Sequence, residues 1–521
     1  MNARRSIVAI VLLLGAVVLS SIARADGAPV KGLVFDPAKV QEDYQVSGTP
    51  AESLEITPPK FPDLTPYTAE AVQAKIVRKP AGTIAVRRML EQNTLVEFTG
   101  GDERIREWLK RQGEMPQVIF IDGGYVTPKD LAKALPAKYF EETEPGIYIA
   151  RRPIVVNQGA TFHIDKSTKD FRLSSDHGAF LINDSKLFIT DSRLTAWREK
   201  DNSQDWFAKK GRFRPFLNSW GGTETYIVNS VVSSLGYTAS KSYGVSISQY
   251  SPAMHPIMKR DHPTGWLINS MFDDMWYGFY CYEAFDVVLL NNTYRNNLVY
   301  GIDPHDRSRR LIIAGNTAYG TVQKHGIIIS REVNDSWIIN NRSYENTLSG
   351  IVIDRISVNN VVANNEVYRN GSDGITIYES GDNLLMRNKS FNNGRHGIRV
   401  RNSYDVTLFE NISMANGLLG VYGHVKDLTH TPRDLQLDPF DMNLSLNVIG
   451  DRLIGNQSGA ISVVAPRSVK LSRLEMLMPS KDSGVGMFGA LAQGKSEILD
   501  LMIRQKKAVH VLPLQKLAQR Q

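Results

Sequence analysis

The sequence predicts an all-β fold, a right-handed parallel β-helix, with a small N-terminal α/β cap and a C-terminal capping segment. Three observations predict it. Glycines recur at a nearly constant spacing in the second half of the chain, asparagines and bulky side chains keep step with them, and short runs rich in Ile and Val follow most of the glycines. Such a repeat is typical of a solenoid, in which each coil buries its apolar face against its neighbours.

The glycine column marks one position in each coil. Its members are spaced by 23 to 25 residues: Gly278, Gly301, Gly326, Gly350, Gly374, Gly397 and Gly420. Neighbouring coils of a β-helix lie about 4.8 Å apart, so equivalent residues stack on one another. We expect each glycine to permit a backbone bend that a Cβ atom would obstruct.

An asparagine column and a column of bulky side chains accompany the glycines. The asparagines are Asn291, Asn316, Asn341, Asn365, Asn388 and Asn411, and three residues after them stand Tyr294, Tyr319, Tyr344, Tyr368, Phe391 and Met414. We expect the asparagines to point inward and to hydrogen-bond the turns above and below. We expect the aromatic side chains to stack inside the coil. Both columns are predicted to be structural. A leucine-rich repeat has a similar period, but its Leu-x-x-Leu-x-Leu frame is not visible in this sequence.

The N-terminus has the pattern of a secretory signal peptide. Arg4 and Arg5 precede an almost unbroken apolar run at 7–19, and Ala23 and Ala25 are the small residues that a signal peptidase reads. We expect cleavage after Ala25. The alternative is a retained membrane anchor, for which the run is short, since a bilayer span needs about 20 residues. No later stretch is apolar enough to span a membrane, so we expect a soluble mature protein.

Changes of texture along the chain predict four regions. They are a signal peptide at 1–25, an N-terminal linker and capping region at 26–145, the β-helix with its groove at 146–475, and a C-terminal cap at 476–521. Prolines between 58 and 66 indicate an extended linker. Segments 102–112 and 127–135 are predicted helices that flank a strand at 117–121, and 496–506 is a predicted amphipathic helix.

Composition restricts the chemistry only mildly. Cys281 is the only cysteine, so no intrachain disulfide can form. The formal net charge is +7, and three of the positive charges lie in the predicted signal peptide. A mild positive charge suits an anionic substrate without requiring one.

Strand alternation predicts which side chains point out of the coil. When each ladder glycine is counted as position zero, hydrophobic residues such as Ile351 and Ile353 dominate positions one and three and should point inward. Positions two and four should point outward: Tyr280 and Tyr282, Asp303 and His305, Ile328 and Ser330, Val352 and Asp354, Thr376 and Tyr378, and Arg399 and Arg401. The fifth position adds Glu283, Asp306, Arg331, Arg355 and Glu379. Aromatic rings for sugars and arginine forks for carboxylates predict a groove that holds an acidic sugar chain.

One coil departs from the others. The segment 300–306 reads Tyr-Gly-Ile-Asp-Pro-His-Asp. It places Pro304 in a strand whose equivalents in the neighbouring coils are rich in Ile and Val. Proline removes a ladder hydrogen bond and is rare inside sheets. A strand that breaks its own pattern is a candidate functional site.

This segment resembles the YG-x-DPH signature of the mannuronan C5-epimerases. The signal peptide, the capped solenoid and the Asn-rich coils are similar to the periplasmic type of that family over essentially the full length of the chain. The calcium-binding nonapeptide repeats of the secreted type are absent from the sequence. The resemblance implies a periplasmic enzyme that needs no cofactor or metal and inverts C5 of mannuronate within a polymer, giving guluronate during alginate biosynthesis. It implies polymannuronate or alginate as partner, with a periplasmic polymer-export complex as a further one, and no nucleic acid.

The reaction needs a base, a group that neutralises the substrate carboxylate, and an acid on the opposite face of the sugar. We expect His305 to be the base, because neutral imidazole is available near neutral pH. Asp303 lies on the same outward face and is expected to orient or polarise His305. Arg331, one coil further on, is expected to neutralise the carboxylate. Tyr300 or a bound water is expected to return the proton, and the sequence does not decide between them.

The remaining candidates are substrate contacts. They are Asp306, Arg355, Tyr282, Arg399 and Arg401. Asp306 either binds substrate or only fixes the turn, and Glu379 is expected to pair with one of the arginines.

Three other functions remain open. A polysaccharide lyase would share the first step, the abstraction of the C5 proton, and then expel the C4 substituent. A glycoside hydrolase would need a pair of carboxylates, such as Asp273 with Asp274 or Asp303 with Asp306. A binding scaffold would guide the polymer without chemistry.

Overall fold

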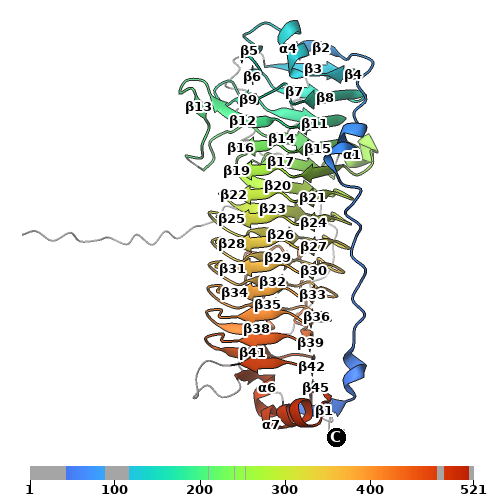
Figure 1. Ribbon diagram of the computed structural model, residues 1–521, viewed down its shortest axis with the longest axis vertical. Helices are drawn as coiled ribbons and strands as arrows, with labels where there is room; N and C mark the ends of the chain where they lie inside the picture. The colour runs from blue at the N-terminus through green and yellow to red at the C-terminus, as the bar shows by residue number, and fades with distance from the viewer. Residues whose placement is uncertain are drawn as a thin grey trace, which may run out of the picture. The chain divides into compact units, whose positions relative to one another are not determined.

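The computed structural model describes residues 43–88, 116–208, 210–239, 241–252, 254–477 and 486–514. The predicted signal peptide and the predicted helix at 102–112 lie outside these ranges. The described chain forms three long sheets whose strands stack coil upon coil, as Figure 1 shows. Nearly all neighbours in the sheets are parallel and come from successive coils, so the prediction of a parallel β-helix is confirmed.

The first sheet, sheet A, ends in the two antiparallel strands β45 and β1. Its strands in spatial order are β4 (Gly124–Val126), β8 (Ala160–Ile164), β11 (Lys186–Thr190), β15 (Glu224–Val228), β18 (Thr264–Ile268), β21 (Val288–Leu290), β24 (Ile312–Ala314), β27 (Trp337–Ile339), β30 (Val361–Ala363), β33 (Leu384–Met386), β36 (Val406–Phe409), β39 (Ser445–Ile449), β42 (Ser468–Ser472), β45 (Ala508–Pro513) and β1 (Tyr44–Thr49).

Sheet B begins with the antiparallel strand β2 against β3 and contains the candidate motif. Its strands are β2 (Thr83–Arg88), β3 (Gln117–Asp122), β7 (Ile154–Val156), β10 (Leu181–Asn183), β14 (Leu217–Ser219), β17 (Gly244–Ser248), β20 (Tyr277–Tyr282), β23 (Tyr300–His305), β26 (Ile327–Ser330), β29 (Ile351–Asp354), β32 (Ile375–Tyr378), β35 (Ile398–Arg401), β38 (Leu419–His424), β41 (Gly459–Val464) and β44 (Met487–Gly489).

Sheet C closes each coil. Its strands are β5 (Phe140–Glu144), β6 (Ile147–Ala150), β9 (Asp170–Ser174), β12 (Arg193–Arg198), β16 (Val231–Ser233), β19 (Met271–Asp273), β22 (Thr293–Arg295), β25 (Thr317–Tyr319), β28 (Arg342–Tyr344), β31 (Glu366–Tyr368), β34 (Lys389–Phe391), β37 (Ile412–Met414), β40 (Arg452–Ile454) and β43 (Glu475–Leu477), with β13 (Ser203–Gln204) paired to β12.

The helices are short and lie outside the coils. They are η1 (Ala51–Leu54), α1 (Ala69–Ala74), α4 (Pro128–Ala134), α5 (His255–Met258), α6 (Ala490–Gln493), α7 (Lys495–Leu499) and the π-helix η3 (Asp500–Arg504). Thr127 caps α4 through a capping box with Asp130. No helix in the described ranges is long and apolar enough to cross a membrane.

The interior of the coils consists of stacked apolar and asparagine side chains. On sheet B the inward column Ile302, Ile327, Ile351, Ile375, Ile398 and Val421 is fully buried. The asparagine column hydrogen-bonds from coil to coil, for example from the backbone N–H and Nδ2 of Asn341 to Oδ1 of Asn365, at 2.9 and 3.0 Å. A second column that the sequence reading missed does the same: Asn346, Asn370, Asn393, Asn416 and Asn456.

Two details of the predicted columns are wrong. The first ladder asparagine is Asn292 and not Asn291, because Asn291 takes the left-handed turn position, with φ +56°, that Gly315 holds in the next coil. The aromatic stack lies outside the coil, on sheet C, where Tyr319, Tyr344, Tyr368 and Phe391 are only partly buried and stack at 4.8 to 5.0 Å. In these coils the inward position is held by the residue before the aromatic one, such as Ala318, and that residue is small or β-branched. Tyr294 is the exception, because it occupies the inward position itself and is fully buried.

The ladder glycines are required by close packing. A Cβ atom on Gly374 would lie 1.9 Å from Oγ of Ser390 and 2.7 Å from the carbonyl oxygen of Gly397. Glycine is therefore required at these positions by contact between coils, and not by the backbone bend that we expected.

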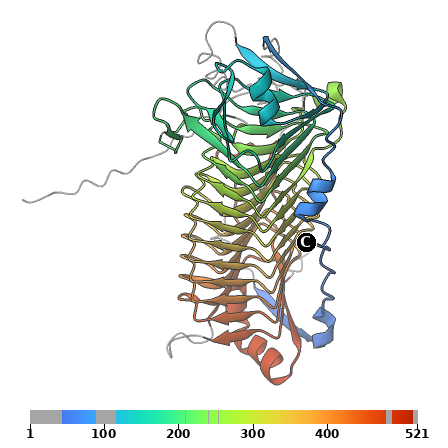
Figure 2. The same cartoon turned by 45° about the horizontal axis from the view of Figure 1, so that its top comes forward.

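The N-terminal segment runs along the outer surface of sheet A from one end of the solenoid to the other, as Figures 1 and 2 both show. β1 pairs with β45 at one end and β2 pairs with β3 at the other. Between them Phe61 packs edge-on against Trp337 at 5.7 Å, and Tyr67 against Trp266 at 4.9 Å. β1 thereby covers the last strand of sheet A at one end of the solenoid, and β2 covers the first parallel strand of sheet B at the other.

Candidate active site

The motif strand β23 presents its polar side chains on the outer face of sheet B. Tyr282 lies beside His305 in register, His305 beside Ser330, and Ser330 beside Asp354. Pro304 faces the interior and is buried. The predicted alternation is therefore confirmed across these coils.

Pro304 also interrupts strand pairing. β23 pairs with β26 only through Ile302 and His305, whereas β26 pairs with β29 at four consecutive positions. Because proline has no backbone N–H, it donates no ladder hydrogen bond to the next coil. The interruption lies beside Asp303 and faces the coil that carries Arg331.

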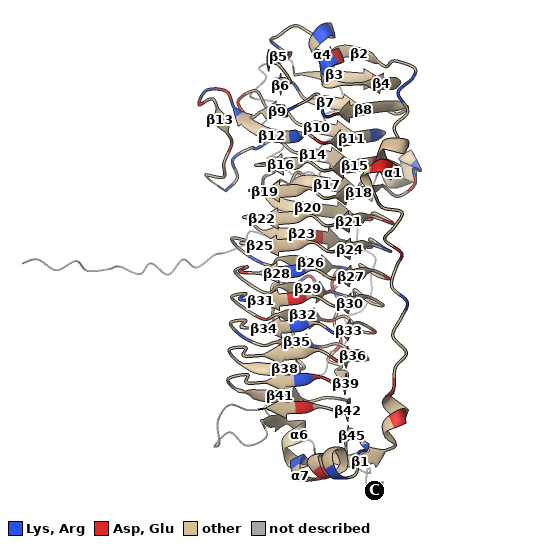
Figure 3. Ribbon diagram, in the orientation of Figure 1, with Lys and Arg blue, Asp and Glu red and all other residues tan. Residues whose placement is uncertain are grey.

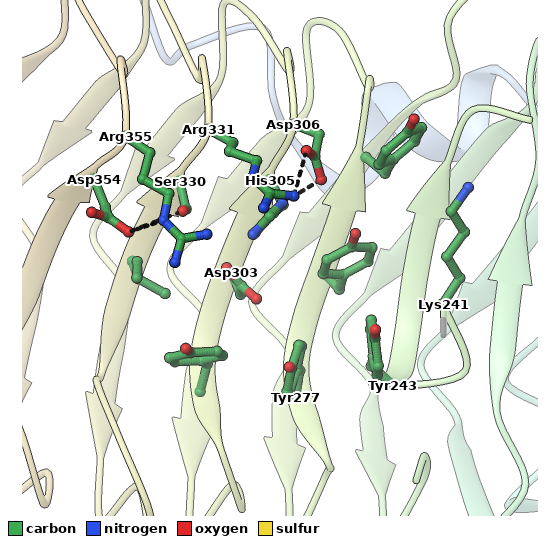
Figure 4. A pocket seen from close by; sticks show the side chains of 14 residues that line it. Lys241, Tyr243, Tyr277, Asp303, His305, Asp306, Ser330, Arg331, Asp354 and Arg355 are labelled. Atoms are coloured by element: carbon green, nitrogen blue, oxygen red, sulfur yellow. Dashed lines mark hydrogen bonds and ion pairs between the residues drawn. The ribbon is translucent and has the colours of Figure 1, made fainter. Parts of the chain in front are cut away.

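A cavity of about 320 Å³ opens over this face, shown in Figure 4. Its lining is polar and aromatic: Lys241, Tyr243, Tyr277, Tyr280, Tyr282, Tyr300, Asp303, His305, Asp306, Ile328, Ser330, Arg331, Asp354 and Arg355. Cations stand at its two ends, Lys241 at one and the arginines at the other. Figure 3 shows charged residues of both signs continuing along sheet B beyond it.

His305 is held by its neighbour Asp306. Nδ1 of the imidazole hydrogen-bonds Oδ2 of Asp306, which leaves Nε2 as the nitrogen available to a substrate. Asp306 begins the turn after β23 with φ +38°, and this conformation returns its carboxylate to the histidine. Burial disfavours the imidazolium, but the hydrogen bond and the charge of Asp306 outweigh it, so the pKa of His305 lies above its ordinary value.

Asp303 does not take the orienting role expected from the sequence. The residue is 2% exposed and lines the cavity, and one of its carboxylate oxygens has no hydrogen-bond partner among the described residues. Burial raises the pKa of this carboxyl to about 7. Strand geometry explains the correction: residues two apart share a face, but only the turn residue Asp306 bends back to reach Nδ1.

Arg331 extends from the turn after β26 toward the same carboxylate. Its Nη1 lies 3.5 Å from Oδ1 of Asp306. Its Nε and Nη2 donate to Oδ1 and Oδ2 of Asp438, at 2.7 and 2.8 Å. Asp438 was not among the predicted residues. The sequence does contain a signal for the segment that carries Asp438. The step in the asparagine column from Asn411 to Asp451 is 40 residues, which indicates an insertion.

Comparisons with known proteins show the fold and the family of this chain. The family model described as right handed beta helix region matches residues 277–429. The mannuronan C5-epimerase of Pseudomonas putida is 57% identical over 98% of both chains, and that of Pseudomonas aeruginosa is 59% identical over 92% of this chain and 88% of that one. The crystal structure of the periplasmic alginate epimerase AlgG matches with a TM-score of 0.79 at 53% identity, covering 81% of this chain and all of that one.

The chain belongs to the mannuronan C5-epimerase family. The fold of this epimerase is accordingly the predicted right-handed parallel β-helix.

Tyr300 of the epimerase lines the cavity from the first position of β23, at the end of the strand away from the turn residues. Its hydroxyl accepts a hydrogen bond from Nζ of Lys324 at 3.0 Å, and its ring stacks parallel to that of His325. Burial raises the pKa of Tyr300, so the phenol stays protonated at neutral pH and can donate a proton.

Of the predicted substrate contacts, the epimerase brings three into the cavity. Tyr282 and Asp306 line it, as does Arg355, whose Nη1 lies 3.4 Å from Asp438. Arg399 and Arg401 lie further along the same face and do not line the cavity. Arg399 donates to Nε2 of His424, and Arg401 pairs with Glu379 at 2.8 Å, as the sequence had predicted for Glu379.

Of the two carboxylate pairs considered for a hydrolase, Asp303 and Asp306 line the cavity of the epimerase, whereas Asp273 and Asp274 do not line it and each pair with an arginine. Asp273 pairs with Arg295 at 2.8 Å, and Asp274 pairs with the fully buried Arg214 at 2.8 Å. In the described ranges, no group of three or more His, Cys, Asp or Glu side chains could hold a metal ion.

Proposed function

We propose that this epimerase inverts C5 of mannuronate residues within polymannuronate, giving guluronate, with His305 as the base. The observation that carries the proposal is the His305–Asp306 pair beside Arg331 in one cavity. The carboxylate of Asp306 orients the ring and stabilises the imidazolium that forms when Nε2 accepts the C5 proton. The role assigned to Asp306 is therefore orientation of the base.

The substrate carboxylate needs a positive partner at the same moment. Loss of the C5 proton places a second negative charge on the carboxylate as it becomes an enolate. A guanidinium in a cavity partly shielded from water stabilises that charge more than it stabilises the ground state. Arg331 is assigned this role because its Nη1 is directed toward the turn that holds the base.

The proton returns to C5 from the face opposite His305. Tyr300 lines the cavity at the other end of β23 from the turn and remains protonated, and a water in the same cavity is the other candidate donor. The bond that breaks is C5–H and the bond that forms is a new C5–H, so no oxidant or leaving group takes part.

We propose further that residues 1–25 are removed, that the mature chain works in the periplasm on alginate, and that it joins a polymer-export complex there. The N-terminal pattern supports the first point, and the similarity to a periplasmic alginate epimerase supports the second. N-terminal sequencing of the protein from a periplasmic extract tests the cleavage. An N-terminus other than Asp26 contradicts it.

The activity is tested with polymannuronate and purified mature protein in deuterated water, with and without a chelator. Proton NMR should show new guluronate that carries deuterium at C5, at the same rate in both samples. His305→Ala should reduce this rate by roughly a thousandfold, because the general base supplies about 10²- to 10⁴-fold. The variant should keep the unfolding temperature of the wild type.

Two outcomes contradict the proposal. Appreciable guluronate from His305→Ala removes the histidine from the base role. Absorbance from an unsaturated uronate, with wild-type protein and without guluronate, identifies a lyase in place of an epimerase.

A further inference from the structure

The segment 425–443, between β38 and β39, brings charges to the active site from a distant part of the chain. Successive asparagines of the ladder are usually 23 to 25 residues apart, but the step from Asn411 to Asp451 is 40. The additional chain reaches back over the outer face of sheet B. It places Asp438 against Arg331, 107 residues earlier in the sequence.

The segment is anchored to sheet B by a buried ion network. Nη1 of Arg433 donates to Oε2 of Glu379 at 2.7 Å, and Oε1 of Glu379 accepts from Nε of Arg401 at 2.8 Å. Nε of Arg433 donates to the backbone oxygen of Asp438 at 2.7 Å. Glu379 is 3% exposed at its side chain and Arg433 10%, so the network is shielded from solvent. The backbone of Asp438 is therefore held in one place relative to the coils.

The carboxylate of Asp438 engages one edge of Arg331. Both of its oxygens accept, from Nε and from Nη2, and its side chain is 5% exposed. A bidentate carboxylate–guanidinium fork fixes the plane of the guanidinium as well as its position. The fork does not use Nη1 of Arg331. This nitrogen points toward the cavity and lies 3.5 Å from Oδ1 of Asp306.

We propose that Asp438 is a positioning residue for Arg331, and that the segment 425–443 thereby completes the active site. The fork turns Nη1 toward the carboxylate of the sugar beside His305, and it limits the contact of Arg331 with Asp306 to one long ion pair of 3.5 Å. This inference rests on the proposed function, because it assigns Arg331 the substrate carboxylate.

The fork also affects the pKa of His305. His305 faces Asp303 and Asp306 from its own strand and turn, Tyr280 from β20, and Arg331 from the turn after β26. Without the fork, Arg331 can close on Asp306 and compete for the carboxylate that holds the imidazolium. The pKa of His305 then falls, because a positive charge approaches and its hydrogen bond weakens.

The test compares Asp438→Asn, Asp438→Glu and Asp427→Asn with the wild-type protein. Asp427 is a carboxylate of the same segment whose hydrogen bonds are with Thr429 of its own turn, so Asp427→Asn matches the change in charge. Initial rates of guluronate formation are measured by NMR over a range of polymannuronate concentrations and from pH 5 to 9.

For Asp438→Asn we expect kcat to fall by roughly tenfold to a hundredfold, because displacing a catalytic group by about 1 Å has an effect of that size. KM should change by less than roughly threefold, and the acid limb of the pH profile should move to lower pH. Asp438→Glu should restore part of kcat and the position of the acid limb. Asp427→Asn should match the wild type.

Arg433→Gln gives a second measurement that does not depend on the folding of the Asp438 variants. It leaves both members of the fork intact and releases the segment from Glu379, so kcat should fall and the acid limb should shift in the same direction. A wild-type pH profile in Arg433→Gln would contradict the role of the segment.

The outcomes separate this inference from the proposed function. Wild-type kcat in Asp438→Asn overturns the inference alone. A lower KM with unchanged kcat also overturns it, because Asp438 would then compete with substrate for Arg331. Absence of guluronate from the wild-type protein overturns the proposed function itself.

Discussion

The carboxylate that holds His305 is the one next to it in sequence, and this depends on the backbone of a single residue. Asp306 follows the strand with φ +38°, in the left-handed region that residues other than glycine rarely adopt. Alternation along β23 predicted that Asp303 and His305 share a face, and they do. Alternation says nothing about a turn residue, so the sequence assigned the orienting role to the wrong aspartate.

The pH dependence of activity should report this pair. A base must be neutral to accept a proton, so kcat/KM should rise with pH through the raised pKa of His305 and then stay level. Asp306→Asn removes the hydrogen bond and the charge that raise the pKa, so the rise should move down by about one pH unit or more. The plateau should fall by roughly tenfold or more, since the ring is no longer held. A profile that keeps the wild-type midpoint would show that Asp306 does not set the pKa.

At the scale of the element, the asparagine ladder joins the coils and ends in an aspartate. Oδ1 of Asp451 accepts from the backbone N–H and Nδ2 of Asn411, at 2.8 and 3.1 Å, as an asparagine would. Oδ2 has no hydrogen-bond partner among the described residues, and the side chain is fully buried. Burial therefore raises the pKa of Asp451 to about 7.

Asp451→Asn should stabilise the protein at pH 8 and change little at pH 4. An unfolded aspartate has a pKa near 3.9, so between pH 4 and 7 the unfolded chain loses a proton that the folded chain keeps. Stability falls through that window and the whole penalty, on the order of 2–4 kcal/mol, is present above it. Thermal unfolding followed by circular dichroism should show a rise of a few degrees at pH 8 only.

The reciprocal substitution provides the control for the ladder. Asn388→Asp places a carboxylate where Nδ2 now donates to the carbonyl oxygen of Val362 at 2.8 Å. It should lower the unfolding temperature at pH 8 more than at pH 4. Equal effects at the two pH values in both variants would contradict the titration.

At the scale of the whole molecule, the N-terminal segment joins the two ends of the solenoid along sheet A. A repeat fold gains stability mainly between neighbouring coils, so its ends are its weakest parts. β1 and β2 pair at opposite ends, and the chain between them packs on the outer face through half-buried side chains such as Phe61 and Tyr67. This segment therefore protects edges that would otherwise pair with other chains.

Phe61→Ala should lower the free energy of unfolding by about 1–3 kcal/mol, because it removes half-buried apolar area and an edge-on contact with Trp337. Limited proteolysis should cut near residues 50–76 faster in this variant. Val77→Ala is the matched control, since Val77 is 63% exposed, and it should behave as the wild type does. Equal proteolysis of the two variants would show that the segment does not stabilise the solenoid.

The sequence by itself determined the coil period, the inward and outward faces of sheet B and the motif that carries His305. Each of these depends on residues within one coil or in equivalent places of the next, and such short-range order is written in spacing and alternation. The tertiary structure alone decided which asparagine begins the ladder, which aspartate holds the histidine, and that Asp438 reaches Arg331. These depend on turn conformation and on the path of an irregular insertion. The 40-residue step from Asn411 to Asp451 shows in the sequence that an insertion is present, but no periodic pattern specifies its path.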